Sequence, residues 1–105
     1  MGNITHLKLS EGVEYSQGSV VSKTLVNRKV GTITLFAFDK GESLSEHTAP
    51  FDAVIQILDG QAKVVIDSIA YEVSKGELII MPANIPHSVE ATEKFKMMLT
   101  MIRGE

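Results

Sequence analysis

The sequence predicts an all-β protein with a single domain, built as a sandwich or a barrel. Its apolar residues occur in short runs interrupted by turn residues, and no long segment has the 3.6-residue period of a helix. Many short strands at close spacing are typical of sandwiches and barrels. The length of 105 residues is enough for one hydrophobic core but not for two, so we expect residues 1–105 to form one domain.

The expected strands are the apolar runs that are rich in β-branched and aromatic residues. They lie at residues 4–9, 19–26, 31–39, 53–58, 62–67, 70–73, 77–82, 87–91 and 95–103. Asp59-Gly60 predicts a hairpin between two of these strands, because glycine accepts a positive φ without steric cost. Asp67-Ser68 has no glycine, and a turn is expected there only because apolar runs flank it on both sides.

The last expected strand is apolar on both faces. Phe95, Met97 and Met101 alternate along one face, while Met98 and Ile102 lie on the other. A sheet with one solvated face should alternate cleanly between apolar and polar residues. We therefore expect one face to cover the interior and the other to meet a second subunit, so that the protein is a homodimer.

The composition argues against several classes of protein. The net charge of −3 disfavours nucleic acid as a partner, because nucleic-acid binding normally needs a basic face. No apolar run has the length of a membrane span, and residues 1–10 lack the apolar core of a signal peptide. The chain has no cysteine, which excludes disulfides and thiolate metal sites. We expect a cytoplasmic protein with no membrane partner.

Two histidines lie in segments with regular glycine and proline spacing. The first segment is GESLSEHTAPFDA, which begins at Gly41, contains His47 and runs on to Gly60. The second is GELIIMPANIPH, which begins at Gly76 and ends at His87. Together they resemble the two motifs of the cupin family, G-x5-H-x-H-x3,4-E-x6-G and G-x5-P-x-G-x2-H-x3-N.

The resemblance covers residues 31–103 and implies a small antiparallel jelly-roll barrel, commonly paired as a homodimer. In such a barrel His47 and His87 would both project into the cavity from neighbouring strands. Asn84 stands where the family usually has glycine, a mild departure because asparagine also tolerates a left-handed backbone.

The metal ligands of a typical cupin are only partly present. His47 and His87 stand at the first and last ligand positions, but Ala49 and Ala53 stand where the family usually has a histidine and a glutamate. Alanine has no donor atom, and catalytic metal sites usually have three protein ligands. We therefore expect a divalent ion (zinc, iron, nickel or manganese) to be weakly bound or absent. Asp52 and Gln56 are the nearest replacements, although regular alternation would point Gln56 away from the cavity.

Three functions remain open from the sequence. The first is a binding barrel that holds a small organic molecule between apolar walls, with His47 and His87 as hydrogen-bond partners. The second is a divalent-metal-dependent enzyme of isomerase, dioxygenase or decarboxylase type with a degenerate two-histidine site. The third is metal-free acid–base catalysis by either histidine, which would need a carboxylate or carbonyl to orient the ring. We find no phosphate-binding glycine loop, nucleophile elbow or nucleotide fingerprint.

Overall fold

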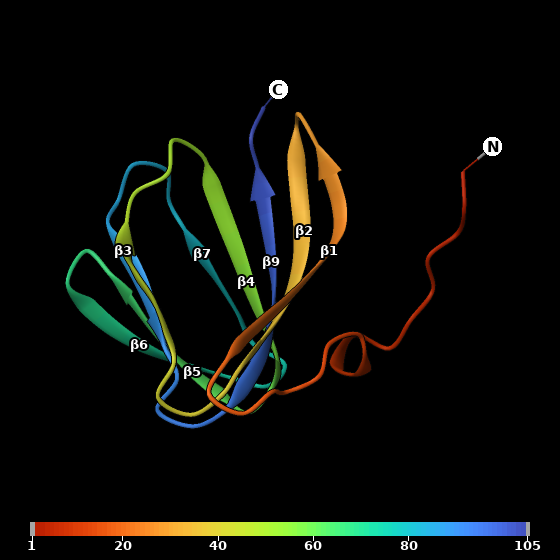
Figure 1. The fold of residues 1–105 in the computed structure, drawn as a ribbon. Coiled ribbons are helices and arrows are strands. Elements are labelled where there is room, and N and C mark those ends of the chain that lie inside the picture. Colours follow the sequence, from red (N-terminus) through yellow and green to blue (C-terminus); the bar gives the residue numbers. More distant parts are fainter. Residues whose placement is uncertain (1, 105) are drawn as a thin grey trace.

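The computed structural model describes residues 2–104 and contains two β-sheets that face each other (Figure 1). One sheet has five strands in the order β1-β2-β9-β4-β7, and the other has four in the order β3-β8-β5-β6. The strands are β1 (Val20–Arg28), β2 (Gly31–Phe38), β3 (Ser43–His47), β4 (Asp52–Asp59), β5 (Gln61–Ile66), β6 (Ile69–Ser74), β7 (Leu78–Met81), β8 (His87–Glu90) and β9 (Phe95–Ile102). Neighbouring strands pair antiparallel, so the predicted all-β jelly-roll barrel is confirmed. Within this part of the chain, no helix is long and apolar enough to span a bilayer.

The strand predicted at residues 4–9 is wrong. The segment pairs with neither sheet, and a one-turn 3-10 helix, η1 (Leu9–Glu11), follows it. An apolar run becomes a strand only where a sheet edge offers hydrogen bonds. Here Leu7 packs against the outer face of the five-stranded sheet without pairing, and the chain before it extends away from both sheets (Figure 1). Conversely, β3 was not predicted from the sequence. Leu44 is its only apolar residue, and a single apolar residue shows no alternation that would indicate a strand.

The turn at Gly60 has a different role from the predicted one. Asp59-Gly60 does not close a hairpin, because β4 belongs to the five-stranded sheet and β5 to the other. Gly60 has a φ of 73°, so the chain uses the glycine to cross between the sheets. The turn at Asp67-Ser68 does close a hairpin between β5 and β6, with φ values of 50° and 67° at the two residues. Aspartate tolerates this conformation better than most residues, which explains a tight turn without glycine.

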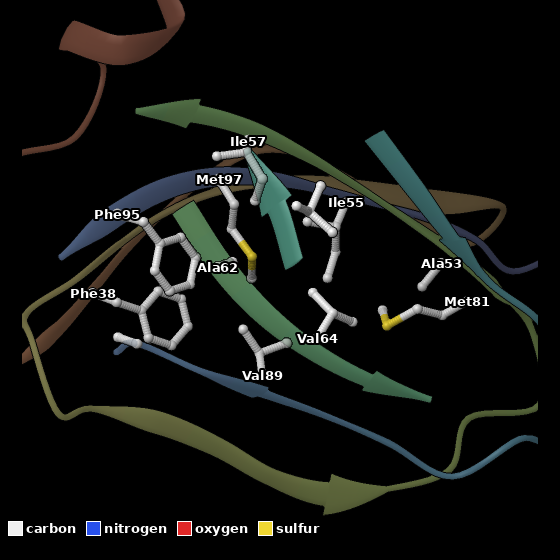
Figure 2. Close-up of a cluster of buried hydrophobic side chains, with 12 residues drawn as sticks. Phe38, Ala53, Ile55, Ile57, Ala62, Val64, Met81, Val89, Phe95 and Met97 are labelled. Carbon is white, nitrogen blue, oxygen red and sulfur yellow. The ribbon is translucent and has the colours of Figure 1, made fainter. Parts of the chain in front are cut away.

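The core fills the space between the two sheets, as Figure 2 shows. Phe38 on β2 and Phe95 on β9 are fully buried and stack with their ring centroids 4.6 Å apart. Ile55 and Met97 continue the same inner face toward the far end of the barrel. Aromatic stacking adds to the large apolar area that each ring removes from water, so this pair anchors one end of the core.

The outer face of the five-stranded sheet is partly covered by the chain's own N-terminal segment. Val13 packs there against Leu35 and Ala37, with Met98 beside them. Met98 is thus partly buried within the chain itself, and the contact of this face with a second subunit stays a prediction. The part of this face that includes Ile102 is more exposed.

Two polar contacts fasten the N-terminal segment to the sheet. The Tyr15 hydroxyl donates a hydrogen bond of 2.6 Å to the Asp59 carboxylate. Burial and this hydrogen bond raise the pKa of Tyr15 above its ordinary value. The Nζ atom of Lys96, a buried residue, donates to the backbone carbonyl of Ser10 at 2.6 Å. The buried ammonium group thus has a hydrogen-bond acceptor, as burial of a charge requires.

The rest of the outer face has no cover among residues 2–104. A row of register partners crosses all five strands there: Val26, Ile33, Thr100, Val54 and Ile80. Ile80 and Ile102 are each 55% exposed. Register partners share one face of a sheet, so these side chains form a continuous, largely apolar band.

Candidate functional site

The site begins with the pairing of β3 and β8. Although only one apolar residue marks β3, its register with β8 places His47 directly opposite His87. The two imidazole rings lie edge to face, with centroids 4.4 Å apart and an angle of 66° between their planes. Two histidines that are forty residues apart in sequence therefore lie side by side.

Each ring is held by a backbone carbonyl two residues before it in the sequence. The Nδ1 atom of His47 lies 2.7 Å from the carbonyl oxygen of Ser45, and that of His87 lies 3.0 Å from the carbonyl oxygen of Ile85. A carbonyl oxygen only accepts hydrogen bonds, so Nδ1 carries the proton in both rings. When such a ring carries no second proton, its lone pair is on Nε2. The carbonyls fix both the tautomer and the orientation of the rings.

A cavity of about 50 Å³ lies beside this pair, between the two sheets. Its walls contain both histidines and otherwise only apolar side chains: Leu44, Ala49, Ala53, Ile55, Met81, Val89, Met97, Leu99 and Met101. His87 is only 6% exposed, whereas His47 is exposed at the surface. His47 therefore marks the mouth of the cavity and His87 lies deeper.

The two alanines that replace the usual metal ligands both line this cavity. Ala49 precedes β4 and Ala53 lies on it, 3% exposed. Their methyl groups extend the apolar wall to the positions where the family usually has donors. Among residues 2–104, no three histidine, cysteine, aspartate or glutamate side chains gather to hold a metal ion. The donor set is two imidazoles, which does not match the three protein ligands of an ordinary catalytic site.

The two residues considered as replacement ligands are used elsewhere. The Asp52 carboxylate accepts a hydrogen bond of 2.9 Å from the backbone N–H of Ala83, and Asp52 does not line the cavity. Gln56 pairs with Leu78 and Met98 on the outer face, as regular alternation predicted. Neither side chain adds a donor to the histidine pair.

The apolar residues of the wall were not singled out from the sequence. A usable signal was nonetheless present, because side chains two residues from a cavity residue on the same strand share its face. Val89 lies two positions after His87, and Ile55 two positions after Ala53. Leu44 carried no such signal, because the register of β3 with β8 shifts between Leu44 and His47.

Comparison with known proteins agrees with this architecture. The family model described as "Cupin domain" matches residues 34–103, and the chain belongs to this family of barrel proteins. A conserved protein of unknown function from Streptococcus pyogenes is 39% identical, with a TM-score of 0.92, over 100% of this chain and 92% of its own.

Two further structures are similar. A cupin 2 conserved barrel domain protein from Leptotrichia buccalis is 47% identical with a TM-score of 0.89; the match covers 91% of this chain but only 47% of that one. A cupin superfamily protein from Desulfitobacterium hafniense is 26% identical with a TM-score of 0.89, over 97% and 94% of the two chains. No curated protein matches the sequence.

Proposed function

We propose that this cupin barrel binds a small, mostly apolar molecule in the cavity between its sheets, with His47 and His87 holding the ligand's polar group. The observation that carries the proposal is the composition of the wall, which is apolar except for the two imidazoles. Apolar pockets with a few convergent polar groups are the usual form of a small-molecule site. The alanines at the two lost ligand positions increase this apolar character.

The orientation of the rings defines the polar group that the site would accept. With Nδ1–H donated to a backbone carbonyl, a neutral imidazole offers Nε2 as an acceptor. A ligand hydroxyl is the complementary donor. If a ring is protonated, Nε2 becomes a donor instead and suits a carboxylate. An alcohol, phenol or small carboxylic acid with a hydrocarbon body therefore fits best.

The size of the cavity limits the ligand. A dry apolar cavity of about 150 Å³ holds one benzene molecule in an engineered protein. The cavity here is about 50 Å³, so it admits only a few heavy atoms unless its wall moves. Met81, Met97 and Met101 supply that freedom, because an unbranched thioether side chain adapts to irregular shapes.

A metal-free acid–base catalyst is the second candidate function. Proton transfer needs a ring whose tautomer and orientation are fixed, and the Ser45 and Ile85 carbonyls supply this for His47 and His87. A divalent-metal-dependent isomerase, dioxygenase or decarboxylase is less well supported, because the two alanines leave the pair without a third protein ligand.

The test compares two isomeric probes of similar size, of which only one can donate a hydrogen bond. 1-Butanol can donate to Nε2, whereas methyl propyl ether has the same atoms and cannot. NMR titration of the unmodified protein should show a preference for the alcohol of roughly 2- to 12-fold, the range for one hydrogen bond. The double variant His47→Ala with His87→Ala should lose this preference, and His6→Ala, which alters an exposed histidine outside the cavity, should keep it.

Elemental analysis of protein purified without added metal distinguishes the small-molecule-binding barrel from the divalent-metal-dependent enzyme. A stoichiometric metal ion that disappears in the double histidine variant, together with no preference for 1-butanol, would overturn the binding function. A preference for the alcohol without stoichiometric metal supports it. Turnover of a bound alcohol or acid that depends on His87 would favour the acid–base catalyst instead.

A further inference from the structure

The side chain of Thr32 has an unexplained property. Thr32 is 7% exposed, and its Oγ1 atom is the one buried side-chain polar atom in residues 2–104 that has no hydrogen-bond partner. A buried hydroxyl without a partner costs free energy, and such groups in folded proteins call for an explanation. Valine has nearly the same shape and would avoid the cost, so the hydroxyl points to a use.

The register of the five-stranded sheet places Thr32 in line with the cavity. On the inner face, Thr32 of β2 is the partner of Met101 on β9, Met101 is the partner of Ala53 on β4, and Ala53 is the partner of Met81 on β7. Met101, Ala53 and Met81 line the histidine cavity, and Thr32 does not. Met101 is thus the side chain next in this row between the hydroxyl and the cavity.

Met101 is suited to move. It has three rotatable side-chain bonds and is only partly buried. If Met101 turns out of this row, the cavity extends across β9 toward β2. The hydroxyl of Thr32 then borders the same space as the imidazoles.

We infer that Met101 gates a longer cavity in which Thr32 forms a second polar anchor, opposite the histidine pair. The inference rests on the proposed binding function and defines its ligand class. The ligand is an elongated small molecule with an apolar middle and a polar group at each end. One end meets Nε2 of His47 and His87, and the other meets Oγ1 of Thr32, which both donates and accepts.

The dimensions of the sheet set the length of the probes. Neighbouring strands are about 4.8 Å apart, so Thr32 lies roughly 10 Å from the cavity residue Ala53 across the sheet. The histidines lie on the facing sheet, so the span between the two anchors is found by varying the length of the probe. 1,4-Butanediol, 1,6-hexanediol and 1,8-octanediol bracket this range. Each is compared with the alcohol of equal carbon number (1-butanol, 1-hexanol and 1-octanol), which lacks the second hydroxyl.

The experiment measures both members of each pair by NMR titration of the full chain. For each pair, the titrations give the ratio of the Kd of the alcohol to the Kd of the diol. At one chain length, this ratio for the unmodified protein should be roughly 2- to 12-fold higher than at the other lengths, as expected for one added hydrogen bond. Thr32→Val should remove this preference and leave binding of the alcohol unchanged. Thr32→Ser should retain it. Thr34→Val is the matched control, because Thr34 is the next inner-face residue of β2 and pairs with Leu99.

A second readout follows the gate itself. With methyl-labelled methionine, the Met101 resonance should shift more with the preferred diol than with the matching alcohol, and Met97 should respond similarly to both. Equal binding of diol and alcohol at every length, or a diol preference that survives in Thr32→Val, would overturn the inference. In that outcome the histidine-dependent binding of alcohols would still stand. If no alcohol or diol binds, the proposed function fails and the second anchor fails with it.

Discussion

Gly60 provides a sharp test of how the two sheets are joined. It lies between β4 and β5 with a φ of 73°, a conformation that L side chains rarely adopt. A Cβ atom at this position would clash with the backbone carbonyl oxygen of Lys94 and lie 3.1 Å from the Cα and Cβ atoms of Phe95. The obstructing atoms are mainly backbone, so no side-chain rotation relieves the clash.

The cost of Gly60→Ala can be worked from these contacts. Forcing a non-glycine residue into the left-handed region costs about 1–2 kcal/mol. Overpacking against atoms that cannot yield adds about 1–3 kcal/mol. The sum is about 2–5 kcal/mol, a large part of the roughly 5–15 kcal/mol that stabilises a typical domain. The damage would reach the core directly, because Phe95 stacks on Phe38.

Gly76→Ala is the matched control. Gly76 also has a positive φ, of 87°, but a Cβ atom there would meet no heavy atom within 4 Å. Only the conformational cost of about 1–2 kcal/mol should remain. Urea unfolding followed by circular dichroism, with all proteins at one concentration, measures both values. An equal or smaller loss in Gly60→Ala than in Gly76→Ala would refute the reasoning.

Three further predictions concern the site, the N-terminal segment and the open face. The double substitution Ala49→His with Ala53→Glu should tighten zinc binding by at least about 10-fold, since even outer-shell partners of a metal contribute that much. Calorimetric titration of both proteins with zinc measures the difference. Equally tight binding by the unmodified protein would show that it already completes its site by another route. Tyr15→Phe should lower the free energy of unfolding by about 1 kcal/mol at pH 7, because it removes the hydrogen bond to Asp59. The pKa of Tyr15 is raised on folding, so the stability that Tyr15 contributes should persist up to about pH 10 and decline above it. Urea unfolding of both proteins from pH 7 to 11 measures this. A difference in unfolding free energy that stayed constant over this range would contradict the prediction. Finally, we propose that a second copy of the chain covers the apolar band that ends at Ile80, together with Ile102, which lies two residues from Thr100 on the same face of β9. Ile102→Glu should then shift sedimentation toward monomer, whereas Ile69→Glu, equally exposed on the other sheet, should not; a monomeric unmodified protein at micromolar concentration would count against the dimer.

The amino-acid sequence was sufficient for the elements whose cause is local. Short apolar runs bounded by turn residues predicted most of the strands, because a half-buried strand needs that pattern wherever it lies. The spacing of glycines, prolines and histidines in the two motif segments indicated the cupin barrel. Asn84 has a φ of 65°, the left-handed conformation expected from the glycine that it replaces. Residue type and spacing alone carry this information, since steric limits on φ act within one residue.

Only the tertiary structure decided what depends on contacts between distant segments. Alternation showed that β9 is apolar on both faces, but not that Met98 packs against the cluster that contains Val13 while Ile102 stays exposed. Likewise, Gly60 predicted a turn but not the sheet to which the next strand belongs, and the position of Thr32 beside Met101 required the register of β2 with β9. A sequence period specifies which side chains share a face. What covers that face is determined by long-range packing, in which distant segments compete to bury the same apolar surface.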